Sequence, residues 1–246
     1  MNGRTRRLGR LLSPGGHLRM VPMDHGISMG APDGLDDPAK IAVALAKAGA
    51  TCFTAHRGLI PALAGAVGDA GLLLHLSAST DAAPDPNDKR LVATVEDALR
   101  HGCDGVSIHL NLGSLTEPRQ LEEAGRVAGD CERWGMPLLA MVYPRGPNVK
   151  DPKDPLLVAH AARLAYELGC DVVKVPFTGT SASFARVVAA APIPILAAGG
   201  PRDAKGFLDA MAAAKQGGAR GFSAGRNLFA QPEGAKRMAA LAKVFP

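Results

Sequence analysis

Apolar and polar positions along the chain follow a recurring pattern of a helical stretch, a glycine and a short apolar run. Four segments of twelve residues align without gaps, and they begin at Lys47, Arg100, Glu167 and Gln216. In each segment the glycine follows the end of the helical pattern, where the left-handed backbone of a helix C-terminus favours this residue. The pattern therefore predicts four helix-to-strand units of the same geometry.

The intervals between these units leave room for further strands. The aligned glycines are Gly49, Gly102, Gly169 and Gly218, which lie 49 to 67 residues apart. Additional apolar runs occupy 17–26, 71–80, 137–146 and 192–200, and several of the helical stretches between them begin at an Asp-Pro pair, which suits a helix start. Eight strands alternating with eight helices predict a single α/β domain over residues 1–246, a (β/α)8 TIM barrel. A doubly wound open sheet is the alternative; it explains the eightfold count less well, and no GxGxxG motif follows the first strand.

Lys174 lies in the middle of an apolar strand, where a lysine is rarely buried unless something pairs with it or uses it. The alignment places it in one column with Thr54, Ser107 and Ser223. Because alternate barrel strands contribute four side chains to each interior layer, this column predicts one inward-facing polar layer near the barrel mouth. Burial disfavours the charged form of an amine, and an uncharged amine can attack a carbonyl to form a Schiff base. A rim lysine whose ammonium reaches water is the alternative.

Polar residues collect where the predicted strands end, and active sites of barrels lie at the C-terminal strand ends. The last two ends carry Gly199, Gly200, Gly225 and Arg226. Glycine-rich backbone there can bring N–H groups close to a phosphate, and arginine would supply charge. Tight turns that need glycine for their conformation alone are the alternative.

Two further side chains suit proton transfer at the same face. Tyr143 and Asp24 follow strands that we take to be neighbours, and both are suitable acids or bases. A hydrogen-bonding or core role is the alternative for Tyr143, and a turn or loop-capping role is the alternative for Asp24.

Histidines are spread over the first four strand ends. They are His25, His56, His75 and His109. Together they could bind a divalent metal ion and support a metal-dependent aldolase. Since no HxH or HxxxH cluster is present, we expect no metal, and we expect His25 to contact the substrate.

Composition and charge narrow the class of protein. Of the 246 residues 47% are hydrophobic and 4% aromatic, and the formal net charge is +5. This charge suits an anionic substrate, but without interleaved basic and aromatic residues it predicts no nucleic-acid binding. Four scattered cysteines without a CxxC pair fit a reducing cytosol, and the lack of long apolar runs predicts a soluble cytoplasmic protein without a membrane segment. We expect the arginine-rich start to be a solvated turn, with phosphate binding as the alternative.

Several motifs at the strand ends resemble the archaeal-type class I aldolases, a family that includes fructose-bisphosphate aldolase and 2-amino-3,7-dideoxy-D-threo-hept-6-ulosonate synthase. The motifs are VPMDHGIS, HLSAST with PDPNDK, VSIHLNLGS, MPLLAMVYPRG, VVKVPFTG, AAGGP and AGRN, in order from about residue 6 to 229. The resemblance implies a Schiff base on Lys174 without a cofactor, proton transfer by Tyr143 with help from Asp24, and a homo-oligomer, commonly a decamer. It further implies a phosphate site made of Gly199, Gly200, Gly225 and Arg226, with Arg145 orienting the site.

The heptulosonate synthase branch fits the sequence better than the fructose-bisphosphate aldolases, which tend to have Trp where Met141 stands. The resemblance then implies a phosphorylated keto donor, either dihydroxyacetone phosphate or a ketose phosphate, joined to an aldehyde, for which we favour aspartate 4-semialdehyde. Phe177, Thr180 and Arg202 depart from the usual family residues near the mouth. Fructose-bisphosphate aldolase and a catalytically silent phosphosugar-binding barrel are the alternatives.

Overall fold

The computed structural model describes residues 2–246 and contains a closed barrel of eight parallel strands. The barrel strands are β1 (Leu18–Pro22), β2 (Cys52–Ala55), β3 (Gly71–His75), β6 (Gly105–Leu112), β7 (Leu138–Pro144), β8 (Val172–Pro176), β9 (Ile195–Ala198) and β10 (Gly221–Ser223). They follow one another around the barrel in chain order, and β10 pairs with β1 to close it. The predicted (β/α)8 barrel is thus confirmed, and the open sheet is wrong.

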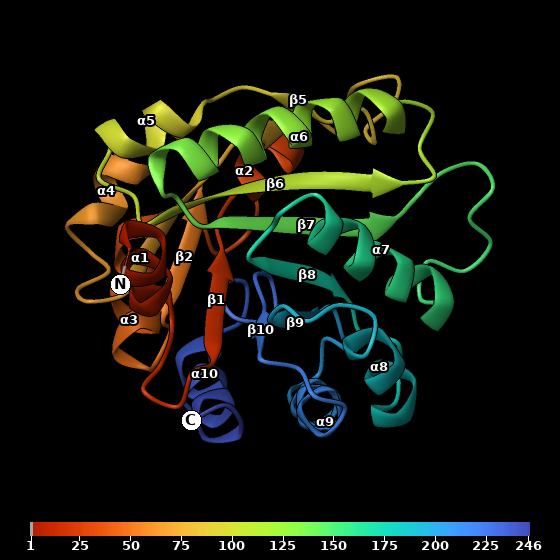
Figure 1. The fold of residues 1–246 in the computed structure, drawn as a ribbon. Helices are drawn as coiled ribbons and strands as arrows, with labels where there is room; N and C mark the ends of the chain where they lie inside the picture. Colours follow the sequence, from red (N-terminus) through yellow and green to blue (C-terminus); the bar gives the residue numbers. More distant parts are fainter. Residues whose placement is uncertain (1) are drawn as a thin grey trace.

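Each barrel strand is followed by a helix that covers the barrel from outside (Figure 1). These helices are α3 (Pro38–Lys47), α4 (Ile60–Ala64), α5 (Val95–Arg100), α6 (Glu117–Trp134), α7 (Pro155–Glu167), α8 (Ser181–Val188), α9 (Ala204–Gln216) and α10 (Gly234–Val244). Helices α3 and α7 begin at the Asp-Pro pairs, where the side chains of Asp37 and Asp154 accept backbone N–H bonds of the first turn. No helix within residues 2–246 is long and apolar enough to cross a membrane.

The four aligned glycines all adopt left-handed backbone conformations directly after helix ends. The φ angles of Gly49, Gly102, Gly169 and Gly218 are 110°, 68°, 84° and 96°. They close α3, α5, α7 and α9, as the repeat predicted. A shared local requirement therefore produces the internal similarity of the sequence.

Four short elements add to the eightfold pattern: α1 (Gly3–Leu11), α2 (His25–Met29), β4 (Ser77–Ala78) and β5 (Arg90–Leu91). Helix α1 closes the N-terminal end of the barrel, where Leu11 packs into the interior with Leu18 and Leu73. Nε of Arg4 lies 2.8 Å from Oδ1 of Asp171, and Arg7 donates to the carbonyl oxygen of Gly135. The expectation of a solvated arginine-rich turn is therefore wrong for these two arginines, because they fasten α1 to the barrel.

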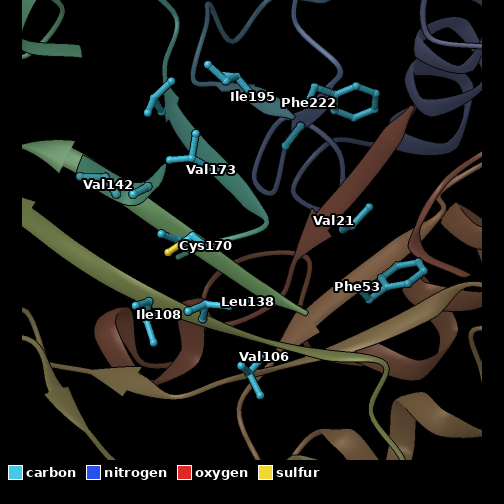
Figure 2. Packing of buried hydrophobic residues seen from close by; sticks show 14 of the residues in the cluster. Val21, Phe53, Val106, Ile108, Leu138, Val142, Cys170, Val173, Ile195 and Phe222 are labelled. Carbon is cyan, nitrogen blue, oxygen red and sulfur yellow. The ribbon is translucent and has the colours of Figure 1, made fainter. Parts of the chain in front are cut away.

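Strand side chains divide between an outer and an inner packing layer. Outward-facing residues such as Val21, Phe53 and Phe222 pack with the helices in one large cluster (Figure 2). Met20, Leu73, Leu139, Val172 and Leu196 belong to a separate cluster inside the barrel. This apolar interior supports the layers above it.

The next interior layer towards the mouth is polar. Thr54, Ser107, Lys174 and Ser223 are all buried, and they come from the alternate strands β2, β6, β8 and β10. Because side chains of a strand alternate between the two faces, their shared register places them at one level inside the barrel. The predicted polar layer is present in the structure.

Replacing Leu11 by Ala should leave a cavity at the N-terminal end of the barrel, because this side chain is 1% exposed inside the apolar interior. We expect Leu11→Ala to lower the free energy of unfolding by about 3 kcal/mol. Urea unfolding followed by circular dichroism measures the change. The matched control is Leu115→Ala at a side chain that is 78% exposed, which should change the value by less than about 0.5 kcal/mol. Equal stability of the two variants would contradict the conclusion that α1 closes the N-terminal end of the barrel.

Candidate active site

A pocket of about 360 Å³ opens among the C-terminal ends of the barrel strands. Eight of the nine predicted site residues line it, and they are His25, Tyr143, Arg145, Lys174, Gly199, Gly200, Gly225 and Arg226. The ninth, Asp24, contacts the lining residue His25. The structure therefore brings the whole predicted set together, although its members are up to about 200 residues apart in the chain.

Lys174 is 7% exposed and belongs both to the polar layer and to the pocket lining. Its Nζ donates to Sδ of Met141 on the neighbouring strand at 3.6 Å, and a thioether is a weak acceptor. No carboxylate lies within ion-pair distance of Nζ in residues 2–246. The amine is therefore held in place by packing while most of its hydrogen-bonding capacity remains open to a ligand.

Tyr143 lies beside the amine at the end of β7. Nζ of Lys174 is 5.9 Å from the centre of its ring, and Cζ of Arg145 is 4.8 Å from the same centre. The ring of His109 packs against it with centroids 5.1 Å apart. Because β1 and β7 are on opposite sides of the barrel, the expectation that Asp24 and Tyr143 follow neighbouring strands is wrong. They approach the interior from two sides.

Asp24 follows β1 and lies between two histidines. One carboxylate oxygen is 3.6 Å from Nδ1 of His25, and the other is 3.6 Å from Nε2 of His75. Burial raises the pKa of Asp24, but His75, Lys174 and His25 favour the charged form more strongly and hold the pKa well below its usual range. Asp24 is therefore ionised at neutral pH, and a carboxylate of such low pKa is a weak base that suits charge stabilisation.

His75 connects Asp24 to the polar layer, a role that the sequence did not reveal. Its side chain is 3% exposed, and Nδ1 lies 2.7 Å from Oγ of Ser107. Burial lowers the pKa of His75 to about 4, so the ring is neutral at pH 7. With the proton on Nε2 facing Asp24, Nδ1 accepts the hydroxyl hydrogen of Ser107. The feature of the sequence that could have indicated an interior position for His75 is the two-residue alternation of the strand, which turns Leu73 and His75 to the same inward face.

The remaining histidines have separate partners. The ring of His56 packs against that of His75, and Nε2 of His109 lies 3.0 Å from Oδ1 of Asn111. Burial lowers the pKa values of both rings. Within the described part of the chain, no three His, Cys, Asp or Glu side chains are arranged to hold a metal ion.

Positive charge surrounds the pocket. Lys153 and Arg202 line it together with Arg145 and Arg226, and none of the four forms an ion pair with a carboxylate in residues 2–246. Sequence reasoning missed Lys153, because nothing in the pattern distinguishes a loop lysine of the mouth from any exposed lysine. Unpaired cations in a pocket attract an anionic ligand.

Two buried oxygens of the pocket lining have no hydrogen-bond partner in the described residues. They are Oγ of Ser223 and Oδ1 of Asn227. Both belong to the segment that ends the last strand, where the sequence had marked Ser223 as a member of the polar layer and had not marked Asn227. Because buried polar atoms are nearly always bonded, these two indicate contacts that a ligand completes.

The sequence profile of the DeoC/LacD family aldolases matches residues 18–231. A 2-amino-4,5-dihydroxy-6-oxo-7-(phosphonooxy)heptanoate synthase of Streptomyces griseus is 51% identical over 66% of this chain, a match that spans 60% of that protein. A 2-amino-3,7-dideoxy-D-threo-hept-6-ulosonate synthase of Halobacterium salinarum is 44% identical over 92% of this chain and 85% of its own. The similarity to the heptulosonate synthases agrees with the branch that the sequence favoured.

A solved structure of an archaeal fructose-1,6-bisphosphate aldolase has the same fold. In it the catalytic Lys is covalently bound to the carbinolamine intermediate of the substrate. Its TM-score is 0.89 at 30% identity, with 98% of this chain and 99% of that chain covered. The relation to this aldolase is thus more distant in sequence than that to the synthases.

The neutral state of His75 predicts how stability depends on pH. Its pKa is about 4 in the folded protein against about 6.5 in an unfolded chain. The unfolded state then binds more protons as the pH falls, and stability should drop by about 3 kcal/mol between pH 6.5 and 4. We expect His75→Gln to flatten this decline. The control is His160→Gln at an exposed position of α7, which should leave the decline unchanged. Urea unfolding at several pH values measures both, and parallel declines in the wild type and His75→Gln would contradict a buried neutral ring.

Proposed function

The chain belongs to the DeoC/LacD family of aldolases, and we propose that Lys174 forms a Schiff base with a phosphorylated keto donor. The amine attacks the ketone carbon, and loss of water leaves an iminium that acidifies the C–H bonds of the adjacent carbon. Removal of one of these protons gives an enamine. The same carbon of the enamine then adds to the carbonyl carbon of an aldehyde, whose oxygen takes up a proton. The observation that carries the proposal is a buried amine with a weak partner inside a cationic pocket.

In this proposal Asp24 stabilises the charge of the iminium, and Tyr143 transfers protons. The iminium keeps a positive charge on the nitrogen, and the ionised carboxylate of Asp24 on the far side stabilises it electrostatically. Proton transfer needs a group that can change its state during the reaction. We therefore assign the proton donor and acceptor role to Tyr143, whose ring lies 5.9 Å from Nζ.

The phosphate of the donor binds at the ends of β9 and β10. Gly199 and Gly200 have φ angles of 85° and 118°, which favour glycine and leave their backbone open to a ligand. Position 225 requires glycine, because a Cβ there would lie only 2.7 Å from Cε1 of His25. Arg226 adds a guanidinium without a carboxylate partner in residues 2–246. This is the arrangement by which barrels of this type hold phosphate.

The product name of the Streptomyces relative indicates which substrates to test. A heptanoate with hydroxyls at C4 and C5, a ketone at C6 and a phosphate at C7 would arise by joining C4 to C5 in an aldol addition. The C5–C7 part is then dihydroxyacetone phosphate, and the C1–C4 part is aspartate 4-semialdehyde. The product named for the Halobacterium relative lacks oxygen at C7, so a ketose phosphate donor would transfer a fragment without phosphate there. We propose aspartate 4-semialdehyde as acceptor and dihydroxyacetone phosphate as the first donor to test.

Borohydride should trap the Schiff base on one lysine. Incubation with dihydroxyacetone phosphate and borohydride is expected to add the reduced donor to the peptide that contains Lys174, as read by mass spectrometry. Lys174→Met should abolish the adduct, whereas Lys153→Met, which removes another lysine of the same pocket, should keep it. An adduct on any other lysine would overturn the assignment. So would the absence of an adduct both with dihydroxyacetone phosphate and with a ketose phosphate in its place.

Condensation and cleavage assays distinguish the two aldolase branches. We expect dihydroxyacetone phosphate and aspartate 4-semialdehyde to give a seven-carbon product at a kcat/KM at least about tenfold above that for cleavage of fructose 1,6-bisphosphate, a difference of about 1.4 kcal/mol in transition-state binding. Mass spectrometry follows the first reaction and a coupled triose phosphate assay the second. Faster cleavage of the bisphosphate would favour fructose-bisphosphate aldolase instead, without affecting the role of Lys174.

A further inference from the structure

Ser223 lines the candidate site with a hydroxyl that makes no hydrogen bond within residues 2–246. The side chain is 4% exposed, its Oγ has no hydrogen-bond partner in residues 2–246, and it lines the pocket. A buried polar group without a partner destabilises a protein, because it loses its hydrogen bonds to water and gains none in return. A hydroxyl in this position is therefore explained by a partner that arrives with the substrate.

Ser223 and Lys174 are neighbours in the polar interior layer. They come from β10 and β8, and the intervening strand β9 places Ala198 beside Ser223 and Leu196 beside Lys174. The equivalent neighbours Thr54 and Ser107, from β2 and β6, bring their oxygens within 3.4 Å. Side chains at adjacent places of this layer can thus approach one another, and Ser223 and Lys174 both line the pocket.

The other hydroxyls of the layer are already engaged and absent from the pocket lining. Ser107 bonds to Nδ1 of His75, and Thr54 lies against Ser107. Asn227 lines the pocket, but the oxygen that lacks a partner is an acceptor. Within the polar layer, Ser223 is therefore the hydroxyl placed to donate to an oxygen of a substrate bound at Lys174, on another strand than the hydroxyl of Tyr143.

We propose that Ser223 donates a hydrogen bond to the oxygen of the carbinolamine on Lys174, an inference that rests on the proposed Schiff base. When Nζ attacks the ketone, the C–N bond forms and the carbonyl electron pair moves to oxygen, which then takes the proton released by nitrogen. In the second step the C–O bond breaks, Tyr143 protonates the departing hydroxyl to water, and the nitrogen lone pair forms the C=N bond.

Ser223 keeps its own proton through both steps. Its hydrogen bond is strongest while negative charge builds on the oxygen, so it accelerates formation of the tetrahedral intermediate more than it strengthens donor binding. Ser223 would thus be a catalytic residue that contacts the reacting oxygen.

The rate of adduct formation tests this role. Purified full-length protein is mixed with dihydroxyacetone phosphate and cyanoborohydride at several donor concentrations, and mass spectrometry follows modified Lys174 over time. We expect Ser223→Ala to lower the maximal rate about 100-fold, as for loss of one donor to a developing oxyanion, with the half-saturating donor concentration changed less than about threefold. Ser223→Cys, a weaker donor of similar size, should give an intermediate rate.

The control removes a buried serine hydroxyl at the other end of the barrel. Ser13 donates to the carbonyl oxygen of Pro246, away from the pocket. Ser13→Ala should leave the trapping rate unchanged, and circular dichroism checks the folding of each variant. If Ser223→Ala does not fold, a wild-type rate in Ser223→Cys overturns the proposal.

The outcomes separate the two levels of inference. Rapid trapping in both the wild type and Ser223→Ala would overturn the role of Ser223 and leave the Schiff base intact. A raised half-saturating concentration with an unchanged maximal rate would likewise overturn it, because it would show a contact made in the ground state. No trapping in the wild type with either donor class would overturn the proposed function itself.

Discussion

Closure of eight strands into a barrel is the constraint on which the site depends. Once β10 pairs with β1, the two-residue alternation of every strand is locked in register, and each interior layer must take its side chains from alternate strands. Apolar side chains fill the N-terminal part of the barrel interior, directly beneath the layer of Lys174. In that layer Lys174 lies together with the hydroxyls of Thr54, Ser107 and Ser223. Closure of the barrel therefore fixes where on β8 the side chain of Lys174 begins and which residues share its layer.

The pocket carries an excess of positive charge, which a negatively charged substrate would neutralise. No carboxylate lines the pocket in residues 2–246, while Arg145, Lys174 and Arg226 all do. Asp24 balances part of this charge from behind, and the histidines near it add N–H groups without adding charge, because burial holds their pKa values low. In the proposed reaction, a phosphorylated donor supplies the missing negative charge at the glycine-rich ends of β9 and β10, and the iminium forms opposite a carboxylate that is already ionised.

The sequence predicted those features that arise from local rules. A glycine after a helix and the alternation along a strand are local, so the repeat correctly predicted the barrel and the layer that contains Lys174. The contact of Arg4 with Asp171 and that of Asp24 with His75 join distant segments, and no local pattern encodes them. The same reason explains why Asp24 and Tyr143 were expected side by side: their positions around the ring depend on the closed strand order.

In the proposed reaction, the closed ring also decides where the aldehyde must enter. The proposed phosphate site lies at the rim above β9 and β10, Lys174 is on the adjacent β8, and Tyr143 on β7 lies next to the amine. A donor bound as proposed would cover one half of the mouth, and the acceptor would then approach over β2, β3 and β6. That half carries His56, His109 and the buried Lys89, whose ammonium donates to Ser79. In this proposal acceptor specificity belongs to the second half of the mouth, and the chemistry at Lys174 could remain constant while that specificity changes.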